Sequence, residues 1–370
     1  MTLDLFKKLE DVKEEALHQK FLMLRDNPIL FHERKIIESW TEGFVDRDNK
    51  IVKEFQTTFH SSFWEFYLFK VFKDSGFVID FSYDSPDFIV KKPIEMNIEA
   101  VISNIRKDGK KETDRKLENF LNNTLPPHKI NDFQEFLEES IIRHSNAIGA
   151  KSEKYLEKYR KKQWVKEDIP FVIALSSYGQ IDYGREFHYP LLALLYGLYY
   201  DASEKIYKTM SHIDKPNSET NATIPLGIFN NSNFEHVSAI IFSCTLTLGK
   251  LTALAISNVE SYHELQKVLN IRHDTEKPFY KIQIVSPKIP EELADGLMIF
   301  HNPYAKQKLT PDILPNTNIV NITFNERKLN VESDNLPLVA RLNIDKYTFN
   351  NGLIRDIDTN YNDHEDISFD

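Results

Sequence analysis

The sequence predicts an α/β protein in which a mixed β-sheet is flanked by helices. Long segments carry apolar residues every three or four positions, which is typical of helices with one buried face. Short runs of β-branched and aromatic residues between them are typical of strands. The two kinds of segment alternate over much of the chain, as they do when helices pack on a sheet. With 370 residues and 41% hydrophobic content, the chain can bury a substantial core without disulfide bonds.

The first quarter predicts three helices. Residues 1–27 mix charged and apolar side chains and predict an amphipathic helix. Residues 31–50 predict a second helix that ends near Gly43, which offers a left-handed stop. Residues 51–73 predict one long helix that ends before Gly76. Its buried stripe consists of phenylalanines spaced by three and four: Phe55, Phe59, Phe63, Phe66 and Phe69.

A β-meander is predicted directly after the long helix. Its three strands begin at Phe77, Asp87 and Ile94, and a Lys-Lys-Pro turn separates the last two. A helix over 131–162 and a buried strand over 170–177 then continue the α/β alternation.

The second half predicts a helix over 188–206, a polar loop over 215–221 and several strands. The acidic stretch 356–370 predicts a frayed tail, because it holds six acidic residues and no Lys or Arg. The predicted strands lie within residues 223–229, 236–243, 279–285, 318–324 and 338–344.

We predict three parts in the chain: a helical extension over 1–45, a main domain with insertions over 46–310, and a β-containing extension with the acidic tail over 311–370. The single cysteine, Cys244, excludes an internal disulfide and a cysteine-based zinc site, so we expect a cytoplasmic protein. No segment predicts a signal peptide or a membrane span. The formal net charge is −10, yet residues 101–166 hold 15 Lys and Arg against 10 Asp and Glu.

Two carboxylates of the meander suggest a site for a hard cation. Asp87 opens one strand directly after Pro86, and Glu99 lies near the end of the next strand. A tight turn between the strands would bring both side chains together, and Mg²⁺ or Mn²⁺ prefers carboxylate oxygens. Glu99 stands among Ile98, Ala100 and Val101, where an unpaired charge would be costly to bury.

The segments Ser-Pro-Asp-Phe-Ile at 85–89 and Asn-Ile-Glu-Ala-Val at 97–101 resemble the signature of the PD-(D/E)XK, or restriction-endonuclease-like, nucleases. The predicted order of helix, three strands, helix and strand over 59–176 is similar to the core of that superfamily. The resemblance implies a Mg²⁺- or Mn²⁺-dependent deoxyribonuclease, with restriction or phage defence as its setting. It further implies that Glu65, on the preceding helix, completes the metal site with Asp87 and Glu99.

The position of the signature lysine, two residues after Glu99, is occupied by Val101. The helix after the meander offers Lys151 as a substitute, with Arg143 in reserve. We expect Lys151 to orient the attacking water and offset charge in the transition state, so the expected catalytic residues are Asp87, Glu99 and Lys151.

Nucleic acid, DNA first, is the expected partner, and a homodimer or larger complex is left open. The expected contacts with nucleic acid are basic residues that follow the meander: Arg106, Lys107, Lys110, Lys111, Arg143, Lys154 and Lys158.

Structural interpretations compete with these assignments. A Pro-Asp pair is common at strand starts, Glu99 could face solvent on an edge strand, and Glu65 could belong to the polar face of its helix. A catalytically silent member of the same fold that binds nucleic acid or a partner protein is the main alternative, because the signature lysine is missing. An ordinary α/β protein that binds no metal is a third interpretation.

Overall fold

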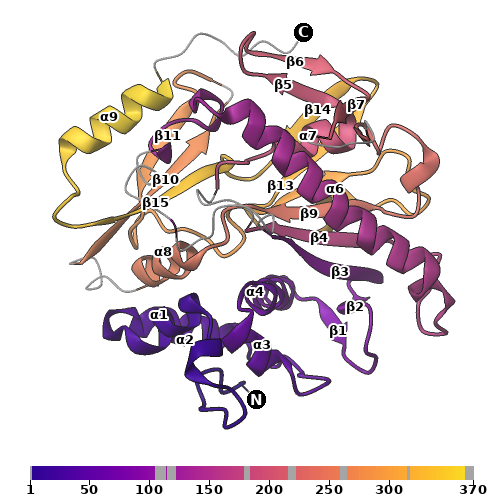
Figure 1. Cartoon of the computed structure of the whole chain (residues 1–370), viewed down its shortest axis with the longest axis horizontal. Helices are drawn as coiled ribbons and strands as arrows, with labels where there is room; N and C mark the ends of the chain where they lie inside the picture. Colours follow the sequence, from indigo (N-terminus) through magenta and orange to yellow (C-terminus); the bar gives the residue numbers. More distant parts are fainter. Residues whose placement is uncertain are drawn as a thin grey trace.

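A computed structural model describes residues 2–104, 114, 122–178, 184–215, 222–258, 265–274, 276–314 and 317–362. The chain is a mixed α/β protein, as its sequence predicts, with a large mixed sheet flanked by helices (Figure 1). Within the described residues, no helix is long and apolar enough to cross a membrane.

The main sheet has eight strands in the order β1-β2-β3-β4-β9-β12-β13-β14. Strands β1 to β3 form the predicted antiparallel meander, β3, β4 and β9 run parallel, and β12 returns antiparallel to β9. The eight strands are β1 Val78–Asp80, β2 Phe88–Lys92, β3 Met96–Ser103, β4 Phe171–Ser177, β9 Ala239–Ser243, β12 Met298–His301, β13 Val320–Asn325 and β14 Lys328–Glu332.

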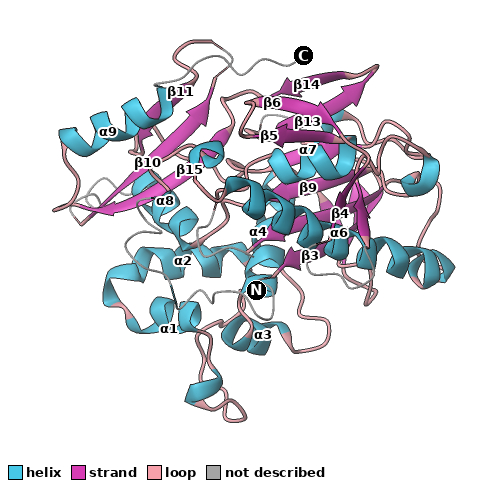
Figure 2. Ribbon diagram, turned by 45° about the horizontal axis from the view of Figure 1, so that its top comes forward, coloured by secondary structure: helices cyan, strands magenta, loops and turns pink. Residues whose placement is uncertain are grey.

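A second sheet has three strands and lies beside the main sheet (Figure 2). Its order is β11-β10-β15, with β10 Gln266–His273, β11 Tyr280–Ile284 and β15 Leu338–Asp345. Two hairpins complete the strands: β5 Leu198–Asp201 with β6 Ile206–Thr209, and β7 His212–Asp214 with β8 Thr223–Pro225. The extension beyond residue 310 therefore continues both sheets.

Helices cover both faces of the main sheet. The N-terminal helices pack on one face, where buried Trp64 donates its indole N–H to the Ala174 carbonyl of β4 at 3.0 Å. Two further helices cover the opposite face, whose core also receives the three-stranded sheet. The N-terminal group is α1 Gln19–Asp26, α2 Phe31–Trp40, α3 Ile51–Thr57 and α4 His60–Asp74, and the two helices on the opposite face are α6 Phe133–Glu157 and α7 Tyr189–Tyr196. Of the remaining described helices, α8 Leu248–Asn258 packs with the N-terminal group and α9 Asn351–Asn362 with the core of the opposite face.

The predicted long helix over 51–73 is wrong as a single element. It is interrupted between α3 and α4, where Phe59 takes a positive φ of 55°. Both helices still point phenylalanines into one core, so the apolar spacing correctly predicts the buried face although the backbone breaks.

The predicted helix over 1–27 is also wrong for its first part, which is irregular up to Glu14. The buried Gln56 side chain donates to the carbonyls of Leu5 and Lys7, both at 2.9 Å. These bonds satisfy backbone groups that a helix would otherwise have paired.

Two predictions near the C-terminal half need correction. The helix over 188–206 ends at Tyr196, because Gly197 takes φ +76° and the following tyrosines enter the β5–β6 hairpin. The tail from 356 is not frayed up to residue 362, since α9 buries Ile357 and Tyr361. Residues 216–221 of the predicted polar loop lie outside the described residues.

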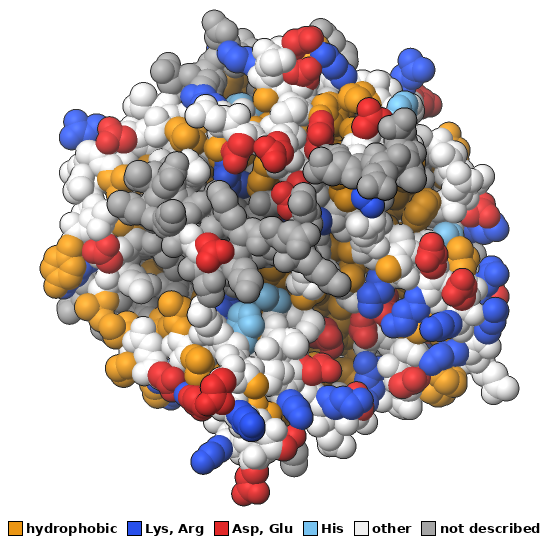
Figure 3. Space-filling model, viewed as in Figure 1, with side chains coloured by type: hydrophobic (Ala, Val, Ile, Leu, Met, Phe, Trp, Pro, Cys, Tyr) orange, Lys and Arg blue, Asp and Glu red, His pale blue; other side chains and the backbone are white. Residues whose placement is uncertain are grey.

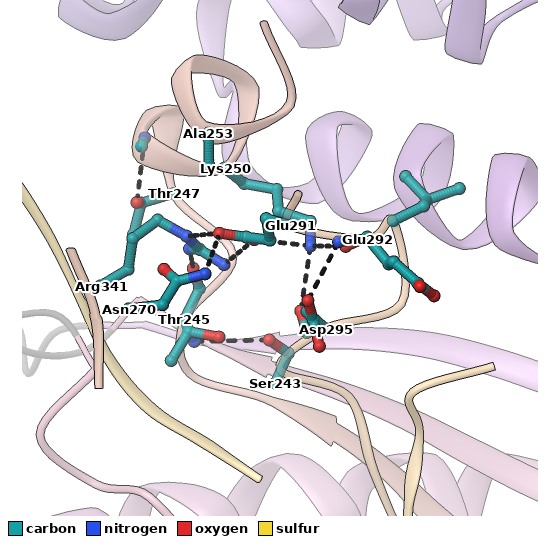
Figure 4. A network of polar contacts seen from close by, with 12 residues as sticks. Ser243, Thr245, Thr247, Lys250, Ala253, Asn270, Glu291, Glu292, Asp295 and Arg341 are labelled. Atoms are coloured by element: carbon teal, nitrogen blue, oxygen red, sulfur yellow. Dashed lines mark hydrogen bonds and ion pairs between the residues drawn. The ribbon is translucent and has the colours of Figure 1, made fainter. Parts of the chain in front are cut away.

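A buried charge network joins the three-stranded sheet to α8 and the main sheet (Figure 4). Glu291 is at its centre: Lys250 donates to Oε1 at 2.8 Å, Asn270 donates to Oε2 at 3.0 Å, and Arg341 bonds both oxygens. Burial opposes ionisation, but the cations Arg341 and Lys250 hold the pKa of Glu291 at about 2.

We predict that Glu291→Gln lowers the free energy of unfolding by about 3–5 kcal/mol at neutral pH, because two buried cations lose their counter-charge. Chemical denaturation measures the change. Glu292→Gln is the matched control, since this neighbouring side chain is exposed and should shift stability by less than about 0.5 kcal/mol. Equal effects of both substitutions would contradict the prediction.

Candidate functional site

The meander places Asp87 and Glu99 across from each other. Strands β2 and β3 pair Phe88 with Ile98 in antiparallel register. Continuing this register by one position brings Asp87, just before β2, opposite Glu99 of β3. Neighbours in a strand alternate between sheet faces. Ile98 and Ala100 pack toward the N-terminal helices, whereas Glu99 points to the face covered by α6.

The Glu99 side chain is fully buried and accepts three hydrogen bonds on one oxygen. Lys151 Nζ lies 2.7 Å from Oε1, Tyr159 Oη 2.8 Å and Lys154 Nζ 3.1 Å. The lysines are three residues apart on α6 and therefore share one helix face. The other carboxylate oxygen, Oε2, is buried and has no hydrogen-bond partner among the described residues.

The expected position of Lys151 is therefore found in the structure, because its ammonium group enters the carboxylate cluster from α6. Val101 packs against the same hydrophobic core as α6, so the residue at the signature position contributes no charged group to the cluster. The catalytic role of Lys151 stays a prediction.

Asp87 is partly buried at the start of β2, and its Oδ2 accepts the backbone N–H of Ala100 at 2.7 Å. Burial raises the pKa of Asp87 to about 6, and the neighbouring negative charge of Glu99 adds to this rise. The cations Lys151 and Arg47 oppose the shift without cancelling it. The Asp87 carboxyl therefore ionises less readily than a free aspartate.

Glu65 reaches the same region from α4. Burial raises its pKa well above the ordinary value, and the next cause is the charge of Asp87. The three predicted carboxylates are therefore electrostatic neighbours in the order Glu65, Asp87, Glu99. Within the described residues, however, no three side chains of His, Cys, Asp or Glu converge closely enough to hold one metal ion together.

The loop before Asp87 is held by side chains that the sequence analysis did not identify. Arg47 Nη1 donates to the carbonyl of Tyr83 at 2.6 Å, and Trp164 Nε1 donates to the carbonyl of Ser85 at 2.8 Å. The rings of Tyr83 and Trp164 stack with their centroids 4.6 Å apart. These partners lie far apart in the sequence, so neither spacing nor periodicity could reveal them.

Tyr159 is a further residue that the sequence analysis missed. It follows the end of α6 directly, and its hydroxyl donates to Glu99. Burial raises the pKa of Tyr159, and the Glu99 carboxylate raises it further, so the phenol stays protonated and acts as a donor. A tyrosine in a basic segment carries no pattern that marks it as part of a site.

Arg143 does not lie on the surface. Its guanidinium is buried and donates to Glu186 at 2.7 Å, to Ser103 at 3.0 Å and to Ser140 at 3.1 Å. Although burial opposes ionisation, the neighbouring His144 and Arg143 hold the pKa of Glu186 far below its usual range. Arg143 is thus engaged in a buried ion pair rather than presented to nucleic acid.

The other expected nucleic-acid contacts divide into two groups. Lys154 is partly exposed beside Glu99, and Lys158 is exposed at the end of α6. Lys and Arg side chains gather over this end of α6 and the neighbouring hairpin (Figure 3). The second group lies outside the described residues: Arg106, Lys107, Lys110 and Lys111.

Comparison of the chain with models of protein families, with curated proteins and with solved structures finds no match.

We predict that Asp87→Asn stabilises the protein above pH 6 by about 1–3 kcal/mol. An acid whose pKa is raised on folding, here from 3.8 to about 6, binds more protons when folded, so stability falls as the pH rises through that window. The stability gained by Asp87→Asn over wild type should therefore vanish below about pH 4. Denaturation curves between pH 4 and 8 measure it.

Asp84→Asn is the matched control for this measurement. The Lys162 ammonium beside Asp84 lowers the pKa of that carboxyl, so its loss should leave stability unchanged or reduced at neutral pH. A destabilised Asp87→Asn protein at pH 8 would contradict the raised pKa.

Proposed function

We propose that this protein is a divalent-metal-dependent phosphodiester hydrolase with a restriction-endonuclease-like core, and that it cleaves DNA. The observation that carries the proposal is a buried carboxylate, Glu99, which faces Asp87 across two strands and meets Lys151 from the covering helix. Carboxylates on adjacent strands with a lysine beside them are the groups that the PD-(D/E)XK resemblance implies.

The donor set fits a hard cation. Glu99 keeps one buried oxygen without a described hydrogen-bond partner, and burial disfavours the charged forms of Asp87 and Glu65, a cost that a bound divalent ion would offset. Mg²⁺ is usually held by one or two carboxylates while waters and phosphate complete its shell. Asp87 and Glu99 would hold it directly, and Glu65 would act on the site from α4 through its charge rather than as a third ligand.

A bound Mg²⁺ or Mn²⁺ would supply water activation and stabilise charge on the phosphate oxygens. Lys151 orients the attacking water through its ammonium N–H groups and offsets the negative charge that develops on phosphorus-bound oxygens. Lys154, whose side chain is 42% exposed, would contact the phosphate from the solvent side. Water adds to phosphorus as the ester oxygen leaves, which yields a phosphomonoester and a hydroxyl.

A second candidate function draws on the same contacts. Three donors already satisfy Glu99 Oε1, and Val101 occupies the signature lysine position. A catalytically silent protein of this fold, which binds nucleic acid or a partner protein, would keep such an ion cluster without metal. Wild-type protein that binds duplex DNA but never nicks it with Mg²⁺ or Mn²⁺ would favour this alternative.

We expect Glu99→Gln to lower Mn²⁺-dependent nicking of supercoiled plasmid at least about a hundredfold, because the substitution removes a ligand charge. Calorimetric titration with Mn²⁺ should show weakened binding at the same time. Glu95→Gln, on the turn of the same hairpin, is the control and should retain both properties. The proposal fails if wild-type protein neither binds Mn²⁺ nor cleaves plasmid, or if the folded Glu99→Gln protein cleaves normally.

We further expect Lys151→Met to lower the cleavage rate by about 10²–10³, which is the usual loss when one donor to a transition-state charge is removed. Mn²⁺ should still bind, because the ammonium contacts Glu99 rather than the metal. Lys158→Met, exposed on the last turn of the same helical segment, should cleave within about threefold of wild type under saturating DNA. Equal rates for both variants would remove Lys151 from the mechanism.

A further inference from the structure

The two ends of the main sheet are built differently. At one end, β1 has only three residues, and its register with β2 shifts between Val78 and Ile79. A short, irregular edge strand resists pairing with another chain. At the other end, β14 is a regular strand of five residues that pairs, among the described elements, only with β13 (Figure 2).

The β13–β14 hairpin fixes which backbone groups of β14 point outward. The turn consists of Glu326 and Arg327, both with positive φ, so the flanking Asn325 and Lys328 form a hydrogen-bonded pair. Hydrogen-bonded pairs alternate along an antiparallel ladder. Leu329 and Val331 therefore direct their N–H and C=O groups away from β13.

The side chains of β14 are complementary to a second copy of the same strand. In an antiparallel pair centred on Asn330, Lys328 faces Glu332 of the second copy, and Leu329 faces its Val331. This is the register that pairs all five residues, and it is also the register in which Leu329 and Val331 exchange their outward hydrogen bonds. Both ends of the pair then bring opposite charges together.

The apolar face of the edge supports the same partner. Leu329 packs against the core under α6 and α7, whereas Val331 on the same side of the strand is 51% exposed. In the proposed pair, Val331 of each copy would contact Leu329 of the other, which extends this core across the two-fold axis.

We propose that β14 is a dimerisation edge, through which two copies of this chain join their eight-stranded sheets into one continuous sheet. The candidate site on β2 and β3 lies near the opposite end of the sheet, so the proposal is independent of the proposed function. Charged residues on an edge usually deter pairing, but here a lysine and a glutamate are arranged to attract in the antiparallel register.

Charge reversal tests the proposal by sedimentation velocity over a concentration series. Lys328→Glu and Glu332→Lys should each weaken wild-type dimerisation by about tenfold or more, because like charges then face each other at both ends. The double variant K328E/E332K should restore it. An equimolar mixture of the two single variants should form a heterodimer, since every facing pair is again opposite in charge.

Val331→Pro provides a second test that does not depend on charge. It removes an outward N–H while the inward bonds to β13 remain, so the variant should fold and stay monomeric. A wild-type protein that is monomeric at all concentrations overturns the proposal. Dimerisation that is insensitive to the charge reversals and to Val331→Pro also overturns it, because the copies then meet through another surface.

Discussion

The parallel pairing of β3 with β4 is the constraint on which the candidate site depends. Seven consecutive residue pairs, from Asn97 with Phe171 to Ser103 with Ser177, lock β3 between two hydrophobic cores. Because a shift by one residue would exchange the two faces, this register decides that Glu99 meets α6 and not α4. The lysines of α6 reach Glu99 only in this arrangement.

Two buried glutamates differ in how completely the protein satisfies their oxygens. Both oxygens of Glu291 are bonded, and its cations hold its pKa at about 2. Glu99 shares one oxygen among three donors and leaves the other without a described partner, while Asp87 beside it has a raised pKa. The first arrangement pairs both oxygens, whereas the second leaves one buried oxygen, which is the one that the proposed cation would use.

The proposed dimer would give the two ends of the sheet separate tasks. The meander end carries the charged groups of the proposed phosphodiesterase site, and the β14 end carries the outward backbone groups that would face a second copy. The cores between them are continuous along the sheet, and helices cover both faces. A substitution at one end of the sheet therefore makes no direct contact with residues at the other end.

The sequence by itself predicted the meander and the facing positions of Asp87 and Glu99, because turn residues and the alternation of strand side chains are local. The approach of Lys151 was expected only from the family resemblance and the helix that follows the meander, and its contact with Glu99 depends on tertiary packing. Only the tertiary structure decided that Tyr159 bonds Glu99 and that Arg47 and Trp164 hold the loop before Asp87. It also decided that Arg143 is buried against Glu186. Those contacts join residues separated by many positions, and their energies depend on burial, which no local pattern encodes. The same holds for the break at Phe59, where packing of two helices on one core outweighed a continuous helical periodicity.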